Sequence, residues 1–169
     1  MNILKRLEKD RSRYYFIDKE SANFIINIIR SNNIKNILEI GTGKAYSTIL
    51  FAKNCESITS IEKYENQYLE AKRNVEESEL SNIKIIFGDA LEVLDLINEK
   101  FNLIFIDGEK KEYLNYFKKA WDKINDGGFI ILDNTLSHRK YLDKFFNYIK
   151  PFKYKEINIG KGLVIVNKR

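Results

Sequence analysis

The chain has 169 residues, of which 44% are hydrophobic, 31% charged and 13% aromatic. This balance excludes a mainly disordered or fibrous chain and predicts that residues 1–169 form a single globular domain. The lone Cys55 excludes an internal disulfide and a zinc cluster, and favours a cytoplasmic protein. No apolar run approaches the roughly 18 residues of a membrane span, and the charged N-terminus lacks the apolar core of a signal peptide. We therefore expect no membrane partner.

The net charge of +5 is concentrated near the C-terminus. Residues 136–169 contain 9 Lys and Arg against 2 Asp and Glu, whereas residues 1–135 contain 20 against 22. A solvated basic edge without a specific partner is the simplest interpretation of this excess. A surface for RNA or for an acidic substrate is the alternative.

The N-terminal third predicts a helix ahead of the first strand. Residues 1–17 are rich in charge and are expected to form a loose arm or a helix. Asp18 can cap a helix that carries Ala22, Ile25 and Ile29 on its apolar face. We expect this helix to lie against a sheet.

From residue 34 onward, short apolar runs alternate with longer amphipathic stretches, which is typical of a parallel sheet covered by helices on both faces. Helical spacing of apolar residues over 64–75 and 113–124 predicts two of these helices. Five runs rich in Ile, Phe or Leu are predicted as buried strands: Ile37–Ile40, Ser57–Ile61, Ile83–Phe87, Leu103–Ile106 and Phe129–Leu132.

The pattern changes after Asn134. A helix is expected around Tyr141–Ile149, followed by a break at Pro151 and a hairpin of Phe152–Ile157 and Leu163–Val166. The predicted fold is therefore α/β, a doubly wound, Rossmann-like and mostly parallel seven-stranded sheet that ends in an antiparallel C-terminal hairpin. Edge strands and a short N-terminus leave apolar surface uncovered, which favours a homodimer.

A glycine turn directly after the first strand is the first candidate binding site. Gly41 and Gly43 let the backbone turn sharply and approach a ligand, and the helix that follows offers free N–H groups. A dinucleotide fingerprint would need Gly or Ala where Tyr46 stands, and no Gly-Lys-Ser/Thr follows, so a pyrophosphate cofactor and a P-loop are disfavoured. A nucleoside-like ligand and a tight turn without any ligand both remain open.

Acidic residues end the next two strands. Glu62 lies some twenty residues beyond the glycine turn, where an acid can accept hydrogen bonds from ribose hydroxyls. An exposed acid without a ligand is the alternative. Asp89 and Ala90 follow the third strand, and Asp89 can cap the helix that begins at Ala90 as well as face a ligand.

Three oxygen ligands end the fourth and fifth strands. Asp107 follows one apolar run, and Asp133 with Asn134 follows the other. If these strands are neighbours, the three side chains converge and suit a hard divalent cation, with Mg²⁺ preferred and Ca²⁺ or Mn²⁺ as alternatives. Acids that merely begin loops are the competing interpretation. His138, the only histidine, is expected at the start of a surface helix rather than in this site.

Taken in order, these motifs resemble class I S-adenosylmethionine-dependent methyltransferases, and more narrowly the cation-dependent O-methyltransferases of the catechol and caffeoyl-CoA type. The resemblance runs from about residue 18 to the end of the chain. The motifs that carry it are residues 39–47, Ile61-Glu62, Gly88-Asp89-Ala90, Asp107-Gly108-Glu109-Lys110 with Tyr113, Asp126-Gly127-Gly128, Asp133-Asn134 and residues 159–163.

The resemblance implies a role for each matching residue. Gly41, Gly43 and Ser47 border the methionine part of the cofactor, Glu62 holds the ribose, and Asp89 and Ala90 lie near the adenine. Lys110 is the general base, and Asp107, Asp133 and Asn134 bind the cation. The cofactor-binding set is Glu39, Gly41, Thr42, Gly43, Ser47, Glu62, Asp89, Ala90 and Asp107.

The function predicted from these features is transfer of a methyl group from S-adenosylmethionine to a cation-bound hydroxyl of a small acceptor. Two alternatives use the same glycine turn. One is a tRNA or RNA methyltransferase that uses the basic C-terminal segment. The other is a non-catalytic nucleotide-binding module.

Overall fold

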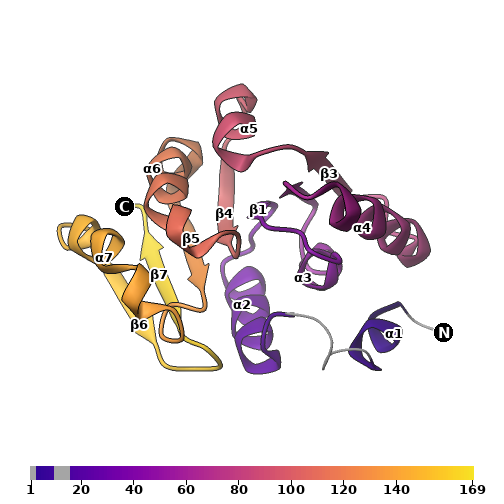
Figure 1. The fold of residues 1–169 in the computed structure, drawn as a ribbon, viewed down its shortest axis with the longest axis horizontal. Coiled ribbons are helices and arrows are strands. Elements are labelled where there is room, and N and C mark those ends of the chain that lie inside the picture. The colour runs from indigo at the N-terminus through magenta and orange to yellow at the C-terminus, as the bar shows by residue number, and fades with distance from the viewer. Residues whose placement is uncertain (1–2, 10–15) are drawn as a thin grey trace.

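The computed structural model describes residues 3–9 and 16–169 (Figure 1). Residues 1–2 and 10–15 of the predicted arm lie outside the described residues. Within that arm, Ile3–Lys9 form helix α1, which buries Ile3 and Leu7 against the rest of the molecule. No helix in the described part of the chain has the length and apolar character needed to cross a membrane.

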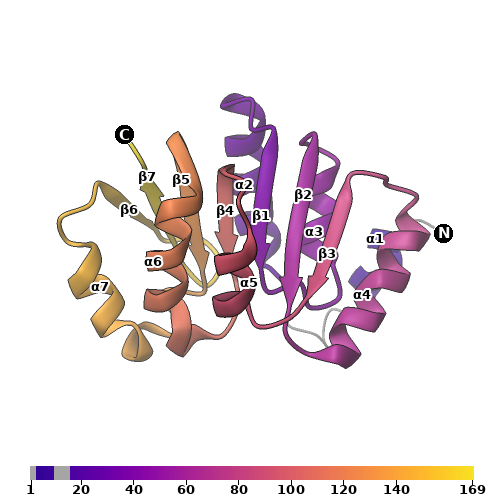
Figure 2. The same ribbon diagram turned by 90° about the horizontal axis from the view of Figure 1, so that it is seen from above.

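Seven strands within the described residues form one sheet in the order β3-β2-β1-β4-β5-β7-β6 (Figure 2). The first five strands pair in parallel, β7 runs antiparallel between β5 and β6, and β3 and β6 are the two edge strands. This arrangement confirms the predicted fold class. The strands are β1 (Asn36–Ile40), β2 (Ser57–Glu62), β3 (Ile83–Phe87), β4 (Phe101–Ile106), β5 (Ile124–Asp133), β6 (Tyr154–Ile157) and β7 (Leu163–Asn167).

Helices cover both faces of this sheet and divide the core into two apolar clusters. Helices α1 to α4 contribute to the cluster on one face, and α5 to α7 to the cluster on the other. Figure 1 shows α1 and α7 at opposite ends of the molecule. The remaining helices are α2 (Lys19–Ser31), α3 (Tyr46–Ala52), α4 (Glu65–Ser78), α5 (Ala90–Leu96), α6 (Tyr113–Lys123) and α7 (Asp143–Ile149), with short 3-10 turns η2 (Lys110–Glu112) and η3 (Arg139–Tyr141).

Local polar contacts explain where two helices begin. The Asp18 side chain accepts a hydrogen bond from the Glu20 N–H at 2.9 Å and caps α2, as the sequence predicts. Asp89 caps α5 in the same way, accepting from the Leu91 N–H at 2.9 Å. Each carboxylate satisfies an N–H that has no partner within its helix.

Four elements begin two or more residues away from their predicted start. Strand β4 begins at Phe101 rather than Leu103. Strand β5 begins at Ile124 rather than Phe129, because its first residues pair irregularly with β4 and its glycines pair with Lys168 beyond β7. Strand β6 begins at Tyr154 rather than Phe152, whose ring instead packs against Trp121 at 4.7 Å between centroids. Helix α7 begins at Asp143, since the preceding residues form η3.

The register of the sheet brings the candidate residues together at the carboxyl ends of its parallel strands. Ile40 pairs with Ile61 on one side and with Ile106 on the other, and Ile106 pairs with Leu132. The next residues, Gly41, Glu62, Asp107 and Asp133, therefore lie side by side at the carboxyl ends of these strands. This edge includes the point between β1 and β4 where the strand order reverses, which is where open α/β sheets bind ligands.

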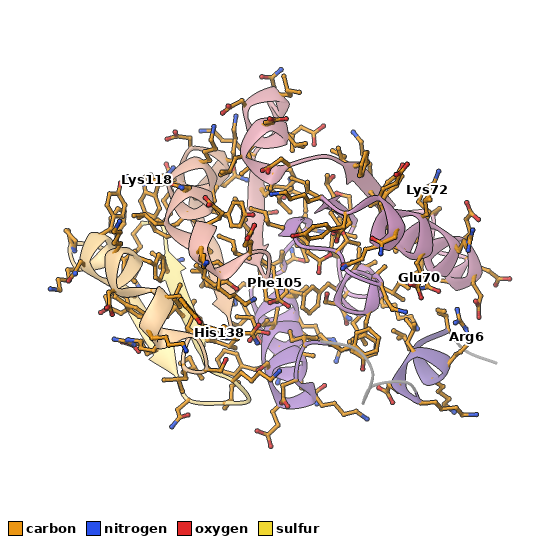
Figure 3. The ribbon with its side chains drawn as sticks, viewed as in Figure 1. Arg6, Glu70, Lys72, Phe105, Lys118 and His138 are labelled. Atoms are coloured by element: carbon orange, nitrogen blue, oxygen red, sulfur yellow. The ribbon has the colours of Figure 1, made fainter. Side chains whose placement is uncertain are left out.

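We expect Phe105→Ala to lower the free energy of unfolding by about 3–5 kcal/mol, because the substitution leaves a cavity in the core. Phe105 is fully buried in β4 near the centre of the molecule (Figure 3), edge-on to Phe51 at 5.3 Å between ring centroids. Urea denaturation measures the loss. Phe87→Ala is the control, since Phe87 is 49% exposed and should cost much less. Similar losses for both variants would contradict this packing.

Candidate active site

A cleft of about 760 Å³ lies at the carboxyl edge of the sheet. Its wall contains the glycine turn after β1, Glu62 at the end of β2, and the segments that follow β3, β4 and β5. Nine predicted site residues line this cleft: Gly41, Thr42, Gly43, Ser47, Glu62, Ala90, Asp107, Lys110 and Asn134. The other three, Glu39, Asp89 and Asp133, lie next to this wall in the chain or in space.

Close backbone packing accounts for the glycine at position 41. Gly41 has φ +96°, and a Cβ atom there would lie 2.7 Å from the Asp107 carbonyl oxygen. The Gly41 N–H donates to the Ile61 carbonyl at 3.0 Å, and the Asp107 N–H donates to the Ile40 carbonyl at 2.9 Å. A side chain at position 41 would therefore separate the turn from Asp107.

Glu62 links the glycine turn to the segment that follows β2. Its Oε2 accepts from the Gly43 N–H at 2.8 Å, and its Oε1 accepts from the Tyr64 N–H at 2.9 Å. The residue is only 3% exposed but lines the cleft. Each carboxylate oxygen retains a lone pair that can accept from a ligand hydroxyl.

Glu39 lies behind the cleft wall and acts on it through other side chains. It is fully buried, and its carboxylate accepts from the hydroxyls of Ser47, Thr48 and Ser60 at 2.5–2.6 Å. Burial raises the pKa of Glu39 to about 7, although the three hydroxyl donors oppose this rise. Ser47 lines the cleft, so Glu39 fixes a residue of the wall without itself facing the cavity.

Two lysines at the rim pair with acids. The Lys44 ammonium lies 2.5 Å from Glu70 Oε1 on α4, which is labelled in Figure 3. The Lys63 ammonium lies 3.0 Å from Asp89 Oδ2, so Asp89 both caps α5 and forms an ion pair with Lys63. The Leu91 N–H first, and then Lys63, lower the pKa of Asp89.

A hydrogen-bonded chain joins Lys110 to the ends of β4 and β5. The Lys110 ammonium donates to Asp107 Oδ1 at 2.6 Å and to the Tyr113 hydroxyl at 2.8 Å. The fully buried Tyr113 donates in turn to the Asp133 carbonyl at 2.8 Å. Burial, followed by the charges of Asp107 and Asp133, raises the pKa of Tyr113 well above its ordinary value, so the phenol keeps its proton.

Asp133 is a buried carboxylate beside a second carboxylate. It is 1% exposed, and burial followed by the charge of Asp107 holds the pKa of Asp133 above its ordinary value. Asn134, at φ +60°, donates its backbone N–H to Asp133 Oδ1 at 2.7 Å and its side-chain amide N–H to Oδ2 at 3.1 Å. The Asn134 amide oxygen remains for another partner. Over residues 3–9 and 16–169, no three His, Cys, Asp or Glu side chains cluster as metal ligands. The predicted set has two acids and one amide, so it stays a prediction.

Four further cleft residues were missed by sequence reasoning. Phe16 stacks on Tyr46 with 4.9 Å between ring centroids, and both line the cleft. His138 and Lys161 line it from the segments after β5 and before β7. His138, which is labelled in Figure 3, precedes η3 as the predicted surface position suggests, but it also lines the cleft. The local motifs do not show that these four residues face one cleft, because segments far apart in the sequence bring them together.

Comparison with known proteins decides the family. The family model described as O-methyltransferase matches residues 2–161. The chain belongs to the O-methyltransferase family. A crystal structure of a "putative caffeoyl-CoA O-methyltransferase" from Staphylococcus aureus has 29% sequence identity and a TM-score of 0.90, covering 98% of this chain and 92% of that one. The predicted resemblance to the catechol and caffeoyl-CoA type is thereby confirmed at the level of family and fold.

Two curated relatives match shorter stretches. The chain is 36% identical over 119 residues to a catechol O-methyltransferase from Niastella koreensis, covering 65% of this chain and 53% of the relative. It is also 36% identical over 104 residues to a "probable cobalt-precorrin-6B C(15)-methyltransferase (decarboxylating)" from Saccharolobus solfataricus, covering 59% and 52%. The chain thus spans about half the length of each, and their names describe methyl transfer to different atoms.

The raised pKa of Glu39 predicts a signed pH dependence of stability. Between about pH 4.5 and pH 7 the unfolded chain releases the Glu39 proton and the folded chain retains it, so this residue's contribution to stability falls by about 3 kcal/mol across that window. The neutral Glu39→Gln variant lacks this term. We therefore compare the free energy of unfolding of Glu39→Gln with that of the wild type by urea denaturation. The difference should increase in favour of the variant from about pH 4.5 to pH 7 and stay constant above pH 7.

The matched control for this experiment is Glu99→Gln, which changes an exposed acid. Its stability should follow the wild type at every pH between 4.5 and 8. Curves for Glu39→Gln and the wild type that stay parallel across the window would contradict the assigned burial of an ionisable Glu39.

Tyr113→Phe removes one hydroxyl from the chain that joins Lys110 to Asp133. We expect the free energy of unfolding to fall by about 1–3 kcal/mol, because the Asp133 carbonyl loses its donor in a buried environment. Thermal and urea denaturation measure this effect. Tyr141→Phe is the control, since Tyr141 is 48% exposed. A Tyr113→Phe variant as stable as the control would show that the buried hydrogen bond contributes nothing.

Proposed function

We propose that this protein transfers a methyl group from S-adenosylmethionine to a hydroxyl oxygen of a small acceptor with the aid of a divalent cation. The observation that carries the proposal is the convergence of Glu62, Asp107, Lys110 and Asn134 on one cleft beside the glycine turn. Glu62 and the glycine turn suit a nucleoside. Asp107, Asn134 and Lys110 suit a cation and a proton transfer. Family membership and the fold support both assignments.

The donor fits the half of the cleft formed by β1, β2 and β3. We assign the ribose hydroxyls to Glu62, the adenine to the wall at Ala90, and the methionine part to the turn at Gly41 and Gly43. Ser47, fixed by Glu39, completes this wall. S-adenosylmethionine supplies an electrophilic methyl group when bound. Crystal structures of an O-methyltransferase from Bacillus cereus with S-adenosylhomocysteine, and of one from Streptomyces achromogenes with S-adenosylmethionine, share this fold.

The end of the cleft at β4 and β5 fits a hard divalent cation. We assign Asp107, Asp133 and Asn134 as its ligands, because two carboxylates and an amide oxygen are hard donors. Two acids held close together in a largely buried site are costly without a positive partner, and the Lys110 ammonium compensates only one of them directly. A bound divalent cation would lower the pKa of an acceptor hydroxyl that coordinates it.

Lys110 is assigned to accept the acceptor proton, a step in which its neutral amine form, after release of a proton to solvent, becomes the ammonium again. Its Nζ lies beside Asp107, so it stands next to any hydroxyl bound at the proposed cation ligands. The Tyr113 hydroxyl accepts a hydrogen bond from the same nitrogen, which also lies 5.0 Å from the centroid of the Tyr113 ring in a cation–π contact. These contacts orient a nitrogen base toward the acceptor, and the cleft is proposed to align the acceptor oxygen with the methyl donor. Alignment of two bound reactants supplies much of the rate enhancement.

Methyl transfer from labelled S-adenosylmethionine to catechol in the presence of Mg²⁺ tests the proposal. We expect product formation that EDTA abolishes and that added Mg²⁺ restores. Asp133→Asn should lower kcat/KM by at least about 100-fold, since it removes a ligand charge at the reacting centre. Asp95→Asn, an exposed acid paired with Lys119 on α6, is the matched control and should keep its activity.

Calorimetry with S-adenosylhomocysteine separates the parts of the proposal. Binding by wild type and Asp133→Asn with similar affinity is expected, because Asp133 is not assigned to the donor. Catechol methylation that survives EDTA would overturn the role of the cation. Absence of S-adenosylhomocysteine binding, together with binding of another nucleotide, would overturn methyl transfer altogether.

A further inference from the structure

The cleft contains a tyrosine hydroxyl that the proposed reaction does not use. Tyr116 lies on α6, is only 3% exposed and lines the cleft. Its ring packs against Gly108, where a Cβ atom would lie 3.2 Å from Tyr116 Cε2. Within residues 3–9 and 16–169, nothing forms a hydrogen bond with this hydroxyl, and the only fully enclosed side-chain atom without a partner is Ser21 Oγ. The Tyr116 hydroxyl therefore opens on the cleft.

Charged residues from three strand ends lie around this hydroxyl. Lys63 follows β2, Asp89 follows β3 and Glu109 follows β4, and the charge of each acts on the phenol. Lys63 Nζ lies 3.0 Å from Asp89 Oδ2 and 3.8 Å from Glu109 Oε2, so the lysine links the two acids. Burial first, and then the charges of Asp89 and Glu109, raise the pKa of Tyr116 to about 12. The phenol therefore keeps its proton and acts as a hydrogen-bond donor.

The position of this group in the chain points to the base of the methyl donor. Lys63 directly follows Glu62, which we assign to the ribose, and Asp89 directly precedes Ala90, which we assign to the adenine. Tyr116 lines the same cleft and is within reach of the charges of both segments. A donor group at this place lies beyond the ribose, where the purine edge is expected.

Glu109 is the acid of this group that can accept from a ligand. The Asp89 carboxylate is already engaged, because it accepts from the Leu91 N–H and pairs with Lys63. Glu109 lines the cleft, and within the described residues the only ion pair or hydrogen bond of its side chain is the one with Lys63. At 3.8 Å that ion pair leaves lone pairs of the carboxylate for another donor.

We infer that the Tyr116 hydroxyl donates to N1 of the donor's adenine and that the Glu109 carboxylate accepts from its 6-amino group. This inference rests on the proposed S-adenosylmethionine site and specifies how that site selects its base. Adenine presents an acceptor nitrogen beside an amino donor, which matches a hydroxyl donor and a carboxylate acceptor. A 6-oxopurine presents the reverse pattern and leaves both protein groups unpaired. Tyr116 and Glu109 are specificity-determining residues and take no part in the chemical step.

Calorimetry with three ligands tests the inference: S-adenosylhomocysteine, its 1-deaza analogue, which lacks N1, and S-inosylhomocysteine, which carries a 6-oxo group. We expect the wild type to bind S-adenosylhomocysteine about 100-fold more tightly than S-inosylhomocysteine, since two hydrogen bonds are lost. Tyr116→Phe should weaken S-adenosylhomocysteine about five- to tenfold and leave the affinity for the 1-deaza analogue unchanged. Glu109→Gln should reduce the preference for S-adenosylhomocysteine over S-inosylhomocysteine about tenfold, because an amide can donate to the 6-oxo group.

The controls are Tyr148→Phe and Glu99→Gln, which change exposed residues elsewhere and should keep all three affinities. Equal weakening of all three ligands by Tyr116→Phe, or an unchanged preference in Glu109→Gln, would overturn the inference. Base selectivity as expected, without methyl transfer to any acceptor, would overturn the proposed reaction and retain the base site. Turnover with selectivity that neither variant alters would do the reverse, and a wild type that does not bind S-adenosylhomocysteine would overturn both.

Discussion

The in-register pairing of β2, β1, β4 and β5 is the constraint on which the rest of this structure depends. Because Ile61, Ile40, Ile106 and Leu132 lie in one row, the residues that follow them leave the sheet at the same edge. A shift of one residue in any pair would send its alternating side chains to opposite faces and move its terminal acid out of line. The buried apolar strands thus position the polar groups of the cleft.

Behind that edge, a second layer of buried polar groups holds the site in place. Glu39 gathers three hydroxyls beneath the glycine turn, and Tyr113 joins Lys110 to the backbone of Asp133. Burying such groups is costly, and their hydrogen bonds offset part of this cost. A reaction between two bound molecules requires rigidly positioned side chains. The buried polar groups that are costly to the fold therefore provide the rigidity that the proposed methyl transfer needs.

The N-terminal segment extends the cleft from outside the sheet. Arg6 of α1 pairs with Glu77 of α4 at 2.7 Å, and Glu8 accepts from the Tyr46 hydroxyl at 2.7 Å (Figure 3 labels Arg6). Phe16 stacks on the same Tyr46 ring, so the segment docks on the helix that follows the glycine turn. Phe16 and Ile17, which precede α2, complete the wall of the cleft.

The amino-acid sequence by itself determined the strands, the glycine turn, the capping role of Asp18 and the acids at the strand ends, because period, apolar runs and special φ values are local properties. It also led to the family, since ordered motifs survive where individual residues change. Tertiary structure alone decided that Glu39 lies behind the wall and that Lys161 faces the cleft. Burial and the approach of distant segments depend on the packed chain, and no window of neighbouring residues contains them.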